Sequence, residues 1–102
     1  MDFKNKGLLR IHYNGRKPVI SYLYKDDELY FATARTSRKM DFFNNQSKDV
    51  EISLGCFGKE RIKGTVEILQ DDEAFFNQLK KDAGLPPFVN FKKHQSIKIH
   101  LK

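Results

Sequence analysis

The chain has 102 residues, the length of one domain, and its hydrophobic fraction of 39% is enough for one modest core. Its 19 basic and 13 acidic residues give a formal net charge of +6, which suits an anionic partner such as a phosphate ligand, a nucleic acid or a membrane surface. The single cysteine, Cys56, excludes an intramolecular disulfide, and because no leading hydrophobic segment or long apolar run is present we expect no signal peptide, no membrane span and a cytoplasmic protein.

The first third of the chain predicts three antiparallel strands joined by tight turns. Residues 8–13 alternate as in a strand, and Asn14-Gly15 follows, a strong hairpin signal because both turn positions need a positive φ. A strand rich in β-branched and aromatic residues covers 19–24. Asp26-Asp27 marks a second turn, and residues 29–34 predict a third strand, which completes an antiparallel meander.

The pattern then changes to the period of a helix. Thr36 and Ser37 offer an N-cap, and Met40 and Phe43 follow at helical spacing. The sequence therefore predicts a short helix that ends near Asn44-Asn45.

The remainder of the chain predicts two more strands, a second helix and a last strand. Alternation predicts strands over 50–56, with Cys56 as an inert buried thiol, and over 62–68. Asp71-Asp72 caps a helix that Gly84 ends, and residues 97–101 alternate again. The order β-β-β-α-β-β-α-β predicts one mainly β domain over residues 1–102, a six-stranded antiparallel closed or split barrel with two short helices.

The strongest signal of a functional site lies where the third predicted strand leads into the first predicted helix. Thr33 and Ser37 can donate hydroxyl hydrogen bonds there. Arg38 can hold two phosphate oxygens at once, and Lys39 adds a point charge beside the free amides of the helix N-terminus. The pattern predicts a phosphate-binding turn, and on these residues alone a capped surface helix with solvated cations stays an open alternative.

These residues resemble the FMN-binding split-barrel family, the pyridoxamine 5′-phosphate oxidase-like flavoproteins. The resemblance is carried by residues 17–22, 29–33 and 37–39, which have the spacing of the family. Residues 49–53 and 62–67 resemble later strands of the family, so the likeness covers most of the chain.

The resemblance implies FMN as cofactor and a set of residues that would hold it. Arg38 and Lys39 would bind the phosphate with help from Thr33 and Ser37, and Lys17 stands where the family often has an arginine near the phosphate. The strand that begins at Val19 would lie along the isoalloxazine and form main-chain hydrogen bonds to it. The implied cofactor-binding residues are Lys17, Val19, Ile20, Ser21, Tyr22, Thr33, Ser37, Arg38 and Lys39.

The resemblance also implies a homodimer with FMN at the subunit interface and an oxidoreductase acting on a small substrate. Vitamin B6 oxidation is not expected, because the tail from Lys93 has no counterpart of the Arg-rich segment with which true pyridoxamine-phosphate oxidases hold their substrate. Two functions without turnover stay open: a flavin-binding or flavin-sensing module, and a basic barrel that binds single-stranded nucleic acid, which the Ser-Arg-Lys pattern disfavours.

Other residues give weaker signals. The three histidines form no close pair, and we expect His12 and His100 at the surface or at the barrel lip and no metal site. The sequence identifies no catalytic residue, no substrate and no electron donor. The role of the segment from Leu85 to Gln95 is also open.

Overall fold

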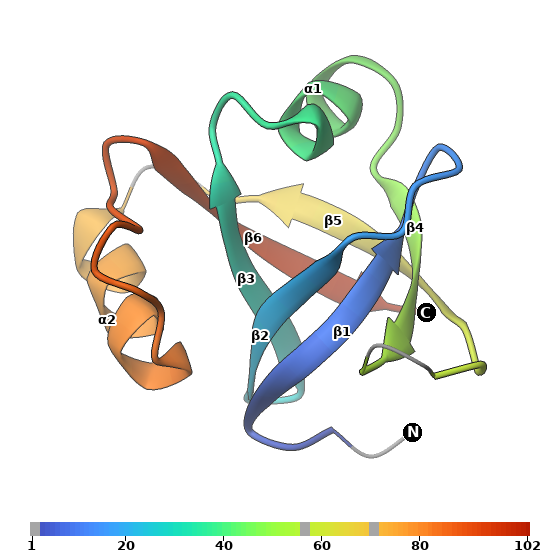
Figure 1. Ribbon diagram of the computed structural model, residues 1–102, viewed down its shortest axis with the longest axis horizontal. Helices are drawn as coiled ribbons and strands as arrows, with labels where there is room; N and C mark the ends of the chain where they lie inside the picture. Colours follow the sequence, from blue (N-terminus) through green and yellow to red (C-terminus); the bar gives the residue numbers. More distant parts are fainter. Residues whose placement is uncertain (1–2, 56–57, 70–71) are drawn as a thin grey trace.

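The order of strands and helices follows the predicted pattern (Figure 1). The computed structural model describes residues 3–55, 58–69 and 72–102, so the predicted strand end at Cys56 lies outside the described residues. Neither helix in these ranges is long and apolar enough to cross a membrane. The elements are β1 (Lys6–His12), β2 (Val19–Lys25), β3 (Glu28–Ala34), α1 (Arg38–Asn45), β4 (Asp49–Leu54), β5 (Ile62–Ile68), α2 (Glu73–Ala83) and β6 (His94–Leu101).

The strands form one antiparallel barrel in the order β1-β2-β3-β6-β5-β4, which β4 closes by pairing with β1. β1, β2 and β3 form the predicted meander, whereas β6 inserts between β3 and β5 and pairs with both. The predicted class, a mainly β six-stranded barrel with two short helices, is confirmed.

Alternate side chains of the strands fill the barrel. In β1, Leu9 and Ile11 are fully buried, whereas Leu8 between its neighbours is 48% exposed, as the predicted alternation requires. α1 adds Met40 and Phe43 to this core, so the helix covers one end of the barrel. The core cluster contains Leu9, Ile11, Tyr13, Ile20, Tyr22, Leu29, Phe31, Met40, Phe43, Val50, Ile52, Val66, Ile97 and Ile99.

α2 packs against β2 on the outside of the barrel. The Asp72 side chain accepts a hydrogen bond from the Phe75 amide at 3.0 Å, and Gly84 ends the helix with a φ of 66°. The predicted cap is thus confirmed at Asp72, while Asp71 lies outside the described residues. Phe76 and Leu79 are the buried residues of α2, and like Leu23 of β2 and Val89 they do not belong to the barrel core cluster.

Both predicted hairpin turns use positive φ angles. Asn14 and Gly15 have φ values of 46° and 76°, and Asp26 and Asp27 have values of 53° and 64°. Aspartate and asparagine tolerate this conformation better than most residues, which explains why the second turn forms without glycine. After the first turn Arg16 pairs with Tyr13. Arg16 lies near the first residues of α1, Arg38 and Lys39.

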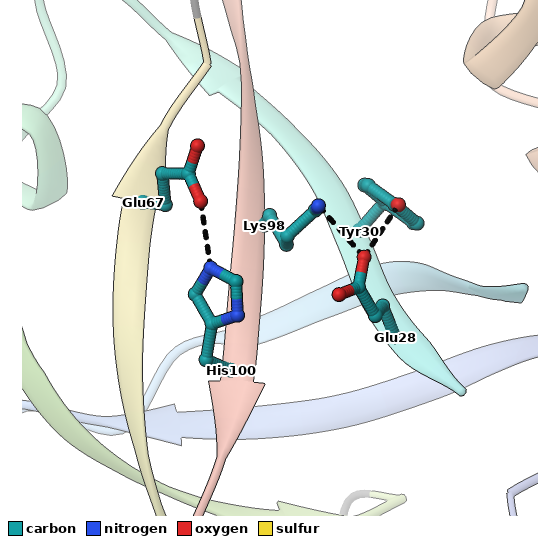
Figure 2. Close-up of polar contacts among 5 residues, drawn as sticks. All are labelled: Glu28, Tyr30, Glu67, Lys98 and His100. Carbon is teal, nitrogen blue, oxygen red and sulfur yellow. Dashed lines mark hydrogen bonds and ion pairs between the residues drawn. The ribbon is translucent and has the colours of Figure 1, made fainter. Parts of the chain in front are cut away.

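Carboxylates pair with cations on the outer face of β3, β6 and β5 (Figure 2). Lys98 Nζ lies 2.7 Å from Glu28 Oε2, and the Tyr30 hydroxyl donates to the same oxygen at 2.9 Å. His100 Nε2 lies 2.7 Å from Glu67 Oε1. The exposed position of His100 is the one that the alternation of the last strand predicts.

Candidate functional site

β2 and β3 pair over less than half of their length. Their register covers only the residues next to the shared turn, from Lys25↔Glu28 to Leu23↔Tyr30. Beyond this point the described partner of β2 is β1, and the described partner of β3 is β6. Figure 1 shows the two strands leaving their turn together and separating toward α1. The barrel is therefore split between β2 and β3 at the end that α1 covers.

Main-chain groups of β2 point into this split. The Pro18 carbonyl accepts a hydrogen bond from β1 at 3.1 Å, and the Tyr24 amide donates one to the segment before β1 at 2.7 Å. The even-numbered residues of this strand therefore face β1. Because successive residues direct their N–H and C=O groups to opposite edges, Val19 and Ser21 direct theirs into the split.

The facing edge of β3 behaves in the same way. The Arg35 amide donates to the Lys93 carbonyl at 2.9 Å, on the side of β6. By the same alternation, Ala32 directs its N–H and C=O groups toward the split. Two strand edges thus offer hydrogen-bond donors and acceptors to whatever lies between them.

A groove of about 470 Å³ lies at the same end, between the first hairpin and α1. Two of its cations, Arg16 and Lys17, come from the hairpin, and two, Arg38 and Lys39, come from the first turn of α1. No carboxylate lines the groove, and within residues 3–55, 58–69 and 72–102 no ion pair neutralises these four cations. Such a groove is suited to an anion.

The N-terminus of α1 opens at this groove. Ser37 is the N-cap, and its Oγ accepts a hydrogen bond from the Met40 amide at 3.2 Å. The Thr33 hydroxyl lies 3.2 Å from the same Oγ, from the end of β3. Because the first amides of a helix have no acceptor within the helix, the N–H groups of Arg38 and Lys39 can serve a ligand.

Burial lowers the pKa of Lys39 below its ordinary value of 10.5. The ammonium group is half-buried beside other cations and has lost part of its water shell. A bound anion would compensate this loss, so the position of Lys39 also favours an anionic ligand.

Arg35 connects the turn before α1 to the start of the neighbouring strand β6 and to the residues just before it. Its guanidinium donates to the Phe91 carbonyl at 3.3 and 2.9 Å and to the side-chain oxygen of Gln95, and it lies 5.3 Å from the centre of the Phe91 ring. Gln95 is buried and donates to the Leu69 carbonyl at 2.6 Å. Phe91 and Gln95, at the end of the segment whose role was open, therefore anchor the turn before α1, which sequence patterns did not predict.

Most of the residues implied by the family resemblance meet at the split end of the barrel. Ile20 and Tyr22 are exceptions, because their side chains are buried in the core and their main-chain groups face β1. Tyr13 and Arg16 line the groove but were missed, although Arg16 directly precedes the predicted Lys17. Lys17, Arg38 and Lys39 line the groove, and Thr33 and Ser37 are in contact at the start of α1. Val19 and Ser21 lie on β2, at the edge of the split.

The histidines lie on different parts of the barrel. His12 contacts Ser53 on β4, His94 contacts Asn90, and His100 contacts Glu67. Across the part of the chain that the structure describes, no group of three or more His, Cys, Asp or Glu side chains is placed to hold a metal ion.

Comparison with known proteins identifies the architecture. No protein-family model and no curated protein matches the sequence. A Listeria innocua protein described as a pyridoxamine 5′-phosphate oxidase superposes with a TM-score of 0.67 at 16% identity, over 97% of this chain and 85% of the other. The chain has the split-barrel fold.

Two further solved structures share this split barrel. General stress protein 26 from Bacillus anthracis superposes with a TM-score of 0.64 at 19% identity, over 97% of this chain and 81% of the other. An F420 reductase superposes with a TM-score of 0.54 at 14% identity, over 95% of this chain and 86% of the other. The fold expected from the resemblance to the pyridoxamine 5′-phosphate oxidase-like proteins is therefore confirmed.

Proposed function

We propose that this split barrel binds FMN and acts as an FMN-dependent oxidoreductase on a small substrate. One observation carries the proposal: the open edges of β2 and β3 meet a cationic groove at the N-terminus of α1. A ligand with a planar hydrogen-bonding ring and a phosphate needs both features side by side.

The residues of the groove fit the phosphate of FMN. Arg38 can donate two parallel hydrogen bonds to phosphate oxygens, and Lys17 and Lys39 add positive charge from two sides. Ser37 keeps a hydroxyl proton to donate while its oxygen accepts the hydrogen bond from Met40.

The split fits the ring system of FMN. The main chain at Val19 and Ser21 offers donors and acceptors that match the carbonyl and N–H groups of an isoalloxazine edge. When bound, the flavin supplies hydride and single-electron chemistry, while these residues orient it and set its electrostatic surroundings. The neighbours described as a pyridoxamine 5′-phosphate oxidase and an F420 reductase also favour redox chemistry over a purely structural function.

We also propose that a second copy of the chain covers the outer face of β1 and β2. Leu8 is 48% exposed and Val19 is 39% exposed, on neighbouring strands where Leu8 pairs with Ser21. A homodimer with FMN between its subunits would bury both apolar side chains next to the split. Sedimentation should give the mass of a dimer for the native chain and of a monomer for Leu8→Asp, and a monomeric native chain would contradict this arrangement.

The test of the proposed cofactor is flavin retention by a variant without the two helix cations. The native protein should keep a yellow flavin spectrum after incubation with FMN and desalting, and Arg38→Ala/Lys39→Ala should lose at least about 100-fold in FMN affinity, since each charge-assisted hydrogen bond contributes about 1.5–3 kcal/mol. Lys92→Ala/Lys93→Ala removes an adjacent pair of exposed cations outside the groove and should retain FMN.

Riboflavin separates phosphate binding from ring binding. The native protein should prefer FMN to riboflavin, which lacks the phosphate, and Arg38→Ala/Lys39→Ala should lose this preference. Undiminished FMN binding by that variant would show that the groove is not the phosphate site. A colourless protein that does not bind FMN but binds an oligonucleotide in a salt-sensitive manner would favour the nucleic-acid function instead.

A further inference from the structure

A second depression lies on the other side of the first hairpin. It has a volume of about 410 Å³ and includes His12 from β1, Glu51 from β4 and Arg61 ahead of β5. It shares Arg16 and Lys17 with the cationic groove beside α1, so the first hairpin lies between two adjoining depressions. The proposed phosphate-binding turn contributes no residue to this second depression.

The second depression carries a net positive charge. Arg16, Lys17 and Arg61 line it, against one carboxylate, that of Glu51. Glu51 stands opposite Lys63 in the β4–β5 register, so a further cation lies next to that carboxylate. In the described ranges neither Glu51 nor Arg61 forms an ion pair, so the cations of the depression are not neutralised within the fold.

His12 lies half-buried in the wall of this depression. Its Nε2 is 2.9 Å from the hydroxyl of Ser53, which is fully buried beneath it, so Nδ1 is the ring nitrogen left for a ligand. The pKa of His12 is lowered from 6.5, first by burial and then by the charge of Arg61, with smaller effects in the same direction from Arg10 and Lys17, while Glu51 acts to raise it. The surroundings of this imidazole are therefore positive on balance.

We propose that the depression between His12 and Arg61 is a second anion site, which binds the carboxylate or phosphate group of the small molecule that reacts with the flavin. The proposal of a reaction partner rests on the proposed function, whereas the anion site itself rests on the side chains that line the depression. Arg61 can grip two oxygens of such a group, Arg16 and Lys17 add charge from the hairpin, and His12 can donate a hydrogen bond. The site would select substrates or electron donors that carry an anionic group.

The test follows the ring signals of the three histidines by NMR while sulfate is added. Sulfate is chosen because its charge stays constant over the range in which histidine titrates, and His12→Gln identifies the signal of His12. Sulfate should raise the pKa of His12 in a saturable manner and leave His94 and His100 unchanged, because those two lie against Asn90 and Glu67, away from the depression.

The binding itself should also depend on pH. Because the bound anion stabilises protonated His12, sulfate affinity should rise as the pH falls through the lowered pKa of the free protein. In His12→Gln this pH dependence should disappear, although Arg61 and the hairpin cations would still give residual affinity.

Two substitutions test the geometry. Arg61→Gln should weaken sulfate binding at least about 10-fold, which is the loss expected for one charge-assisted contact. Lys25→Gln removes an exposed cation at the other end of β2 and should leave the affinity unchanged. Arg61 is exposed and precedes β5, so its replacement should not disturb the core.

Arg38→Ala/Lys39→Ala separates this inference from the proposed function. The variant should lose FMN and still show the sulfate response of His12, and the native protein should show that response whether or not FMN is bound. If no FMN binds at all, a saturable response that depends on Arg61 would still establish the anion site while the flavin function fails.

The inference is overturned if His12 does not respond, if His100 responds equally, if Arg61→Gln binds as well as the native protein, or if FMN displaces sulfate from His12. The same titration with succinate and with NADPH then distinguishes the two sources of the anion. A response to succinate indicates a carboxylate substrate, and a response to NADPH indicates a phosphate-bearing electron donor.

Discussion

The cations at the split end of the barrel and those on the outer face of β3, β6 and β5 have opposite surroundings. Lys98 and His100 each lie 2.7 Å from a carboxylate oxygen (Figure 2). Arg38 and Lys39 share a groove with two more cations and no carboxylate. Like charges around one groove repel each other, so their grouping does not stabilise the barrel by ion pairing and fits the anion-binding role that we propose for the groove.

The largest difference between the two regions should appear in ligand affinity. Arg38→Ala removes one bidentate contact and should lower FMN affinity about 10- to 150-fold, with little change in stability because the side chain is exposed. Lys98→Ala removes a cation from the paired face and should leave FMN affinity unchanged. Titration of both variants with FMN, followed by flavin fluorescence, checks this, and equal losses would abolish the distinction.

The two helix caps provide the next comparison. Ser37→Ala and Asp72→Ala each remove a side chain that accepts a hydrogen bond from a helix amide, and each should lower the free energy of unfolding by about 1 kcal/mol. Ser37→Ala should in addition weaken FMN binding, because α1 opens at the groove and α2 does not. Urea unfolding and FMN titration of both variants measure the two effects, and a loss of FMN affinity in Asp72→Ala would show that the effect is not local.

Breaking a pair on the outer face should cost little. Glu28→Gln removes the carboxylate that both Lys98 and Tyr30 contact. Since these groups are partly exposed and screened by solvent, the free energy of unfolding should fall only slightly, and FMN affinity should not change. A much larger loss in urea unfolding would mean that the paired face contributes more to the fold than surface ion pairs ordinarily do.

The smallest effects are opposite shifts in two lysine pKa values. Burial lowers the pKa of Lys39 below 10.5, so the folded state releases this proton first, and stability should rise with pH between the lowered pKa and the unfolded value. The hydrogen bond to Glu28 raises the pKa of Lys98, so its contribution is complete below 10.5 and is lost as the pH rises through the folded pKa. NMR titration of the two side chains, identified with Lys39→Met and Lys98→Met, tests both directions, and FMN should raise the pKa of Lys39 alone.

Much of the fold could be predicted because its signals are local. The alternation around Leu9 and Ile11, the Asn14-Gly15 turn and the cap at Ser37 each depend on a few neighbouring residues. The helix start at Ser37, with its hydroxyls and cations, could be predicted for the same reason, and its role in phosphate binding stays a prediction.

The resemblance implied a split barrel, but the position of the split could not be predicted from local sequence patterns. It depends on where β2 stops pairing with β3, while β3 goes on pairing with β6, more than sixty residues later in the chain for Ala32↔Ser96. For the same reason all four residues of this strand were predicted alike. The main-chain groups of Val19 and Ser21 face the split, whereas those of Ile20 and Tyr22 face β1 and their side chains are buried in the core. Arg16 and Arg35 look like other surface cations until the hairpin and the segment around Phe91 are placed in space.

The position of β6 has a consequence for how the protein is made. β6 pairs with both β3 and β5, so the emerging polypeptide cannot close the barrel until His94–Leu101 has left the ribosome. Until then β3 exposes one edge toward the split and another where β6 will lie, with Phe31 between them. Such long-range pairing forms slowly, and the nascent chain passes through a stage at which an apolar strand is open to aggregation or to chaperones.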